Sequence, residues 1–308
     1  MKHLTDNNIL VKEQYGFRTN IKTDNAIYHL TNEILNALNN NLSIGGIFCD
    51  LEKEFNCVNH KILLTKLEFY GITGNHHKLY KSYLMDRYES TLLYNENGHS
   101  TSPCSKVEQG VPQGPVLESL LFLLFINDLP KFINDKSVPV LFADDTSILV
   151  SHPNPLVFYK TINSVFQTFN AWFKHNLLSL NLAKTHFIKF ISNNNNQHEI
   201  DIDYDNKSIS AIICTKFLGL TVNYSLTLTN HIDLLTKKLS STRFLFRTIK
   251  PYLSLSALKM ISHSLFHSIM SYSIMFWGNS PHSPVIFKMQ KRVIRILMGI
   301  GYRESCRG

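Results

Sequence analysis

The sequence predicts a globular protein of more than one subdomain, in which helices are combined with antiparallel hairpins. Its 308 residues and 44% hydrophobic content are enough for one large core or two ordinary ones. Two apolar, β-prone runs, 138–142 and 148–150, flank a short acidic turn and predict a hairpin near the middle of the chain. From about residue 228 onward the pattern becomes helical and basic, which sets the last quarter apart from the rest.

The net charge of +8 is concentrated at the C-terminal end of the sequence. Residues 231–308 carry twelve Lys and Arg against two acidic residues, a net of +10, whereas residues 1–230 carry 19 basic against 21 acidic groups, a net of −2. A neutral body with a cationic segment favours a polyanionic partner such as nucleic acid. A basic amphipathic helix on a membrane or on another protein is the alternative.

Other protein classes are excluded by composition. No run reaches the ~18 apolar residues that a membrane span requires, and residues 1–8 lack an apolar signal segment. The five cysteines are odd in number and widely spaced, with no C-x-x-C pair, which predicts reduced structural thiols. We therefore expect an intracellular protein, in the nucleus, the cytoplasm or both, with no membrane segment.

The first half of the chain alternates helical and extended patterns. Residues 24–40 predict an amphipathic helix, and the apolar run 44–49 predicts a strand that ends at Asp50. Asn59 is a plausible N-cap for a helix that stops at Gly71. Further elements are expected as a helix at 75–87, a hairpin about Asn97-Gly98 and a buried helix that contains Leu120 to Ile126.

The second half begins with the acidic hairpin and continues into helices. We expect a helix at 156–172, a hydrophobic hairpin at 217–220, and helices that start near 228, 255 and 284, the second of them running to about 276.

Asp144 and Asp145 lie side by side at the tip of the central hairpin, and Asp50 closes the earlier apolar strand. Adjacent ionised carboxylates repel each other by roughly 4 kcal/mol at ~4 Å in a partly screened site, so a folded protein usually supplies a cation. Asp is also common in turns because its side chain bonds to the backbone, so the pair alone proves little. With Asp50 at a second strand end, three carboxylates could meet around a metal pair.

The sequence around these aspartates resembles reverse transcriptases, and in particular the jockey-type branch of non-LTR (LINE-like) retrotransposons. Residues 142–146 resemble the aromatic-x-Asp-Asp box, 48–56 the box with the other aspartate, and 109–117 the G-V-P-Q-G box. Segments at 14–18, 178–190 and 217–220 follow the family's order as well. The resemblance covers roughly residues 14–300.

The resemblance implies an α+β right-hand polymerase with a palm built on an antiparallel sheet, partial fingers and a helical thumb. It divides the chain into partial fingers at 1–45, a palm with finger elements at 46–222, and a basic thumb with a truncated C-terminal region at 223–308. The implied activity is RNA-directed DNA polymerisation, with an RNA template, a DNA primer and dNTPs as partners.

Roles for single residues are carried over from the matching boxes. Asp50, Asp144 and Asp145 would be catalytic and hold two Mg²⁺ ions, which Mn²⁺ could replace. Arg18, Phe55, Gln113, Gly114 and Lys184 would contact the incoming nucleotide or its pyrophosphate, with Phe55 excluding a 2′-hydroxyl. Contacts to primer and template would come from Phe217, Leu218, Gly219, Lys237 and Lys238. For most of these positions an ordinary structural residue is the competing interpretation.

The sequence departs from the family pattern at a few positions. Pro115 replaces Ser, Glu118-Ser119 replaces Gly-Pro, and Asn56 replaces Asp, although no metal ligand is lost. These departures keep two alternatives open: a decayed element remnant that binds nucleic acid without polymerising it, and a structural protein with no nucleic-acid role. The first predicts duplex binding without primer extension, and the second predicts no salt-dependent binding.

Overall fold

A computed structural model describes residues 2–51, 54–95, 98–111, 116–191, 201–204, 207–301 and 304–305 of the chain. The chain forms two compact units, residues 1–212 and 213–308. Gln113 and Gly114 lie outside the described residues. Within the described part of the chain, no helix is both long enough and apolar enough to cross a membrane.

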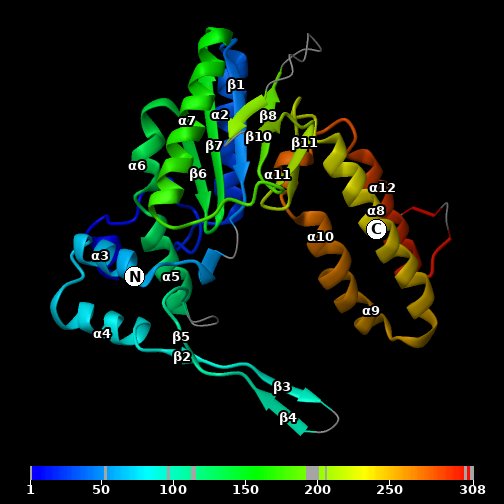
Figure 1. The fold of residues 1–308 in the computed structure, drawn as a ribbon. Coiled ribbons are helices and arrows are strands. Elements are labelled where there is room, and N and C mark those ends of the chain that lie inside the picture. Colours follow the sequence, from blue (N-terminus) through cyan, green and yellow to red (C-terminus); the bar gives the residue numbers. More distant parts are fainter. Residues whose placement is uncertain are drawn as a thin grey trace. The chain divides into compact units, whose positions relative to one another are not determined.

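The first unit is built on a four-stranded antiparallel sheet with the strand order β6-β7-β1-β8 (Figure 1). Strand β1 lies between β7 and β8, and every residue of β1 after Ser43 is buried, which requires cover on both faces of the sheet. The expected strand before Asp50 and the expected central hairpin are thereby confirmed. The strands are β1 (Ser43–Cys49), β6 (Val138–Phe142), β7 (Asp145–His152) and β8 (His186–Phe190).

Two long amphipathic helices pack on the sheet. The aromatic residues of α7 (Pro155–His175) join Ile47 and Phe187 in one core cluster, which places α7 against the face that carries these two side chains. Helix α2 (Thr23–Asn39) buries Ala26, Ile27, Leu30, Ile34 and Ala37 and packs on β1, β6 and β7. Both helices were expected from their spacing of apolar residues.

Helix α5 (Val116–Ile126) packs on α3, and its residues 121–126 are all buried, as the sequence predicts. Asn59 caps α3 through its side-chain oxygen, which accepts from the backbone N–H groups of Lys61 and Ile62. The further helices are α1 (Lys2–Asp6), η1 (Glu54–Asn56), α3 (His60–Phe69), α4 (Gly74–Leu84), α6 (Leu129–Ile133) and η2 (Asn134–Lys136).

A two-stranded ribbon extends away from α4 and α5 (Figure 1). It contains β2 (Tyr88–Glu89) paired with β5 (Ser105–Lys106), and beyond them β3 (Leu92–Asn95) paired with β4 (Gly98–Thr101). All residues of these four strands are exposed. A second small hairpin, β9 (Asp201–Tyr204) with β10 (Lys207–Ser210), completes the unit.

The second unit is a hairpin followed by helices. The hairpin pairs β11 (Cys214–Phe217) with β12 (Leu220–Asn223), as expected for residues 217–220. The single helix expected at 255–276 is wrong, because α10 ends at Ser271 and Ser273 has a φ of +51°, which interrupts the helix. The helices are α8 (Thr229–Ile249), η3 (Lys250–Tyr252), α9 (Leu255–Ile261), the π-helix η4 (Ser262–His267), α10 (Ser268–Ser271), α11 (Ile274–Trp277) and α12 (Pro284–Met298).

Candidate active site

The sheet register brings Asp50 next to the acidic hairpin. Strands β1 and β7 are antiparallel, and Cys49 is paired with Thr146. Asp50 directly follows Cys49 and Asp145 directly precedes Thr146, so the two aspartates continue the same pairing by one step. Cα atoms of paired antiparallel residues are about 4.5–5.5 Å apart. Carboxylates more than ninety positions apart in the sequence therefore meet at one end of the sheet.

The turn between β6 and β7 consists of Ala143 and Asp144. Burial raises the pKa of Asp144 above its ordinary value, a backbone hydrogen bond offsets part of this rise, and the negative charge of Asp50 adds a smaller rise. Asp145 is exposed, while Asp50 and Asp144 are half-buried. The surroundings therefore make the ionised form of Asp144 less favourable than that of a fully hydrated aspartate.

Asp50 is paired with a lysine from the segment after α7. The Nζ atom of Lys184 lies 2.9 Å from Oδ2 of Asp50, and Nδ2 of Asn181 lies 3.5 Å from the same oxygen. The backbone N–H of Asn181 also donates to the carbonyl of Asp50, at 3.0 Å. We call Asp50, Asp144 and Asp145, at one end of the sheet, the carboxylate edge. Lys184, which the family resemblance assigns to the leaving pyrophosphate, therefore lies beside this edge.

The side chains of Asp50, Asp144 and Asp145 are not arranged as a preformed metal-binding site in this structure. Among the described residues, no group of three or more His, Cys, Asp or Glu side chains is arranged to hold an ion. The Asp50 carboxylate is directed to the Lys184 ammonium instead of to the other two carboxylates. The donor set still fits a hard divalent cation, because carboxylate oxygens are the ligands that Mg²⁺ and Mn²⁺ prefer.

Gln14 holds the Ala143–Asp144 turn through a hydrogen bond, a role that the sequence did not reveal. The segment 13–15 pairs with β6 at the sheet edge: Tyr15 N donates to Leu141 O at 2.8 Å, and Leu141 N donates to Glu13 O at 2.9 Å. Oε1 of the buried Gln14 accepts from Ala143 N, at 3.0 Å. The contact between Gln14 and Ala143 could not be read from the sequence, since the two residues are 129 positions apart.

Arg18 is involved in shaping this same segment. Its Nη1 atom donates to the carbonyls of Val11, at 3.0 Å, and Gln14, at 3.3 Å. The guanidinium carries five N–H donors, so two bonds from one nitrogen do not exhaust it. The predicted contact of Arg18 with a triphosphate stays a prediction.

Phe55 follows Asp50 by five positions and is partly buried. Its ring centroid lies 5.1 Å from that of Phe122 in α5. Gly110 approaches closely here, because its φ is +86° and an added Cβ would lie 3.1 Å from Cα of Asn56. Gly110 thus packs closely on the backbone of Asn56, and the contact of Phe55 with a sugar stays a prediction.

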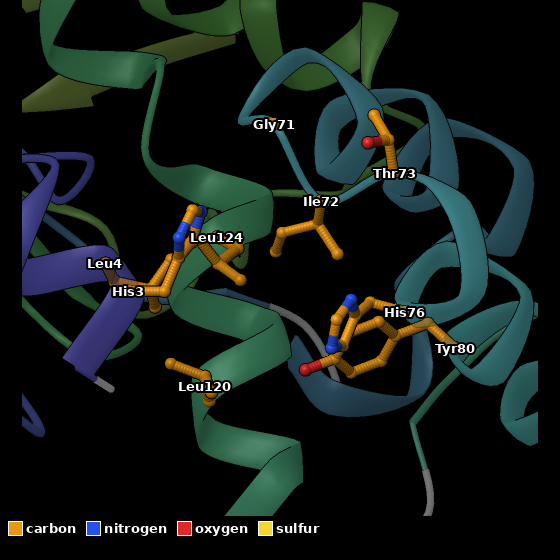
Figure 2. A pocket seen from close by; sticks show the side chains of 9 residues that line it. All are labelled: His3, Leu4, Gly71, Ile72, Thr73, His76, Tyr80, Leu120 and Leu124. Atoms are coloured by element: carbon orange, nitrogen blue, oxygen red, sulfur yellow. The ribbon is translucent and has the colours of Figure 1, made fainter.

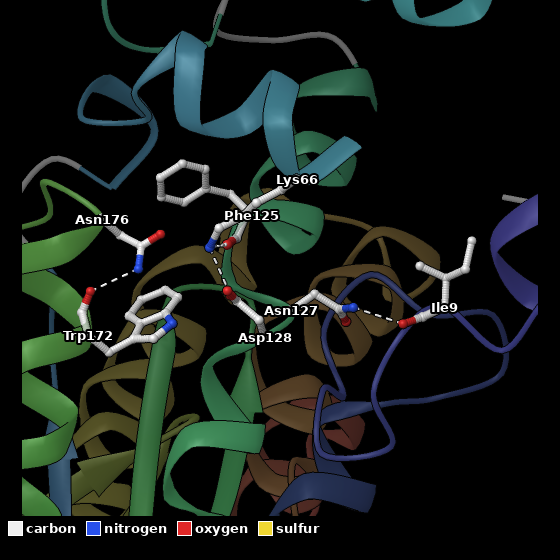
Figure 3. A network of polar contacts seen from close by, with 7 residues as sticks. All are labelled: Ile9, Lys66, Phe125, Asn127, Asp128, Trp172 and Asn176. Atoms are coloured by element: carbon white, nitrogen blue, oxygen red, sulfur yellow. Dashed lines mark hydrogen bonds and ion pairs between the residues drawn. The ribbon is translucent and has the colours of Figure 1, made fainter. Parts of the chain in front are cut away.

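A partly buried lysine, Lys66, joins three elements of the first unit (Figure 3). Nζ of Lys66 in α3 donates to Phe125 O, at 2.6 Å, and pairs with Asp128, at 2.8 Å. It also lies 4.7 Å from the ring centroid of Trp172 in α7. Desolvation lowers the pKa of Lys66, and Asp128 offsets part of that effect.

A pocket of about 300 Å³ lies in the first unit between α1, the end of α3, α4 and α5 (Figure 2). Leu120 and Leu124 of α5 form part of its wall, and the rings of His76 and Tyr80 contribute polar atoms. None of its lining residues belongs to the predicted catalytic set.

The predicted primer-contacting residues lie in the second unit. Leu218 and Gly219 form the β11–β12 turn, with φ values of +45° and +86°. The Tyr272 hydroxyl donates to the Leu218 carbonyl, and a Cβ on Gly219 would lie 2.9 Å from the Tyr272 ring. Lys238 lines a pocket of about 420 Å³ together with Gly219 and Tyr272. Phe217 is buried, whereas Lys237 and Lys238 are both exposed.

Comparison with known proteins gives a consistent set of similarities. The family described as "Reverse transcriptase (RNA-dependent DNA polymerase)" matches residues 1–222. The probable RNA-directed DNA polymerase from transposon BS of Drosophila melanogaster is 27% identical over 317 residues, covering 97% of this chain and 34% of that protein. The polymerase from mobile element jockey of the same organism is 26% identical over 227 residues, covering 72% of this chain and 24% of that protein. The chain thus spans about a third or less of the length of these relatives.

A solved structure shares the fold at low sequence identity. Telomerase from Candida albicans, in complex with the TWJ fragment of telomeric RNA, has a TM-score of 0.53 and 13% identity, covering 98% of this chain and 56% of that one. The expected fold class, α+β of the right-hand polymerase type with an antiparallel sheet, is confirmed.

Proposed function

This chain belongs to the reverse transcriptase (RNA-dependent DNA polymerase) family, and on that premise we propose that it extends a DNA primer on an RNA template by metal-dependent nucleotidyl transfer. The observation that carries the proposal is the register of β1 and β7, which brings Asp50 to the Asp144–Asp145 turn. Members of this family use divalent metal ions. We propose two Mg²⁺ ions here, with Mn²⁺ as a substitute.

Asp50, Asp144 and Asp145 would hold the metal ions. When bound, such ions lower the pKa of the primer 3′-hydroxyl and stabilise the pyrophosphate leaving group. The raised pKa of Asp144 supports this assignment, because a site that disfavours its own negative charge gains from a cation. The protein needs no nucleophilic side chain, since catalysis of this kind depends on positioning and charge.

Lys184 would exchange one partner for another during the reaction. Its ammonium neutralises Asp50 in the structure, at 2.9 Å, and its side chain is 67% exposed. If Asp50 held a divalent cation, the Lys184 ammonium would be free to turn to the phosphates of the incoming nucleotide. Arg18 would bind the same triphosphate, and Phe55 would stand against the sugar.

We assign primer and template contacts to the second unit. The charge supports this assignment, since residues 231–308 carry a net charge of +10. Lys237 and Lys238 lie on exposed positions of α8, where they can reach phosphates without reading the sequence. Each phosphate contact that is lost should lower the salt dependence of binding by about one unit of slope.

Primer extension by the purified chain tests this function. We expect a labelled DNA primer on an RNA template to lengthen with dNTPs and Mg²⁺, and Asp144→Asn to abolish the reaction while duplex binding in a gel-shift assay remains. Extension that continues in Asp144→Asn contradicts the assignment. Duplex binding without extension by the wild-type chain would instead support the alternative of a decayed remnant. Glu118, which departs from the family pattern, motivates that alternative.

A further inference from the structure

The turn that presents Asp144 is one that its own residues do not favour. Ala143 has a φ of +56°, a conformation that non-glycine residues rarely adopt and that persists only where the surroundings fix it. Ala143 is 5% exposed, so its N–H group cannot rely on water and needs an acceptor within the protein. The acceptor that holds this N–H therefore controls the geometry of the turn.

Gln14 supplies that acceptor, and its orientation is determined by the contacts. Oε1 accepts from Gly16 N, at 2.7 Å, and from Ala143 N, at 3.0 Å. The Nε2 atom is buried and makes no hydrogen bond to the described residues. A flipped amide would place the Nε2 donor against two backbone N–H donors, and donors form no hydrogen bond with each other. The observed orientation is thus the one in which both donors are satisfied.

Gly16 completes the contact because it leaves room for the turn. A Cβ atom at Gly16 would lie 2.3 Å from Ala143 N and 3.1 Å from Oε1 of Gln14. The backbone of segment 14–16 therefore presses directly on the turn. The same segment is tied to Arg18, whose Nη1 donates to the Gln14 carbonyl, at 3.3 Å.

We propose that Gln14 is a positioning residue that fixes the Ala143–Asp144 turn and thereby sets the metal affinity of the carboxylate edge. This inference rests on the proposed function. It adds that one short segment, 14–18, sets the position of both Asp144 and the arginine assigned to the triphosphate. Gln14 itself touches neither metal nor nucleotide in this account.

Gln14→Met tests the proposal, because methionine has a similar length and cannot accept these hydrogen bonds. The assay uses the chain bound to an RNA template and a primer ended with a dideoxynucleotide, so that Mn²⁺ binding can be measured by electron paramagnetic resonance without chemistry. We expect Mn²⁺ affinity to fall on the order of tenfold, and single-turnover extension of a normal primer to fall on the order of 10- to 100-fold. Gln167→Met, the same change at an exposed position of α7, should alter neither.

A second-site variant separates positioning from packing. Glycine adopts positive φ readily, so Ala143→Gly should reduce the dependence of the turn on Gln14. In that background we expect Gln14→Met to cost less than about threefold in Mn²⁺ affinity. Equal losses in both backgrounds, or unchanged Mn²⁺ affinity in Gln14→Met, would overturn the proposal.

Two controls keep the outcome interpretable. If Gln14→Met does not fold, Gln14→Asn takes its place, since its amide is one methylene shorter and loses the reach to Ala143. A wild-type chain that neither extends primers nor binds Mn²⁺ would count against the proposed function. A wild-type chain that does both, with no change in the Gln14 variants, would count against the role of Gln14 alone.

Discussion

Two of the hairpins in the first unit, β3–β4 and β6–β7, differ in exposure and in what fixes their backbone. The described residues of the β3–β4 hairpin are all exposed, and β4 begins at Gly98, with a φ of +132°. The β6–β7 hairpin lies in the sheet between Gln14 and β1, and it turns through Ala143 at a φ of +56°. The sequence carries a local Asn-Gly signal for the exposed hairpin, whereas the acidic hairpin is held by contacts from distant residues. The site lies where long-range packing, rather than turn preference, fixes the backbone.

The same glycine-to-alanine change should separate the two hairpins most clearly. Gly16→Ala places a Cβ 2.3 Å from Ala143 N, so we expect a loss of about 3 kcal/mol in the free energy of unfolding, the upper range for overpacking. In Gly98→Ala the new Cβ meets no atom within 4 Å but the backbone is strained at a φ of +132°, so we expect a loss of about 1 kcal/mol, the lower end for such strain. Urea denaturation of both variants measures the difference; equal losses would show that the acidic turn is not braced by segment 14–16.

The next largest effect is expected at Lys66, which joins α3, α5 and α7. Lys66→Ala removes the ammonium that binds Phe125 O and Asp128 and lies over the Trp172 ring. We expect a loss of about 2 kcal/mol, below the usual range for a buried pair because Asp128 is 30% exposed and can be hydrated. Lys61→Ala, on an exposed position of the same helix, is the control and should change stability by less than about 0.5 kcal/mol.

Asp144→Asn should make the protein more stable while removing its activity. Burial and Asp50 raise the folded-state pKa of Asp144 above the unfolded value, so the ionised carboxylate costs stability at pH 7. As the pH falls through that raised pKa to below the ordinary carboxyl value of about 4, the wild-type protein should recover this loss. Melting temperatures recorded at several pH values should show a gap of a few degrees that closes on acidification. A gap that stays constant would mean that the charge is not its source.

The smallest effect is expected on the exposed hairpin. Leu93 is 66% exposed, so Leu93→Ala should change the free energy of unfolding by less than about 0.5 kcal/mol. Leu141→Ala in β6, a fully buried position, should cost about 3 kcal/mol by comparison. A large loss in Leu93→Ala would show that the ribbon is packed against something in solution.

Much of the fold could be predicted because its signals are local. The spacing of apolar residues in α2 and α7, the Asn59 cap of α3 and the apolar run of β1 each depend on neighbouring residues. The break at Ser273 could not be predicted, because its positive φ follows from packing and not from a glycine or proline in the sequence.

The site was predictable only in part, for the same reason. Asp50, Asp144 and Asp145 could be proposed because strand ends and a family resemblance point to them, and the register of β1 and β7 brings them together. The pairing of Lys184 with Asp50 and the contact of Gln14 with Ala143 join residues 134 and 129 positions apart. Contacts of that range leave no periodicity or spacing in a single sequence.

Anomalous scattering from Mn²⁺ would test the central claim most directly. The measurement is a crystal structure of the chain with an RNA template, a dideoxy-ended primer and the next dNTP in the presence of Mn²⁺. We predict at least one Mn²⁺ peak bound by oxygens of both Asp50 and Asp144, with Lys184 moved away from Asp50. A nucleotide-bound complex in which Lys184 stays on Asp50 and no peak lies between the two strand ends would contradict the account.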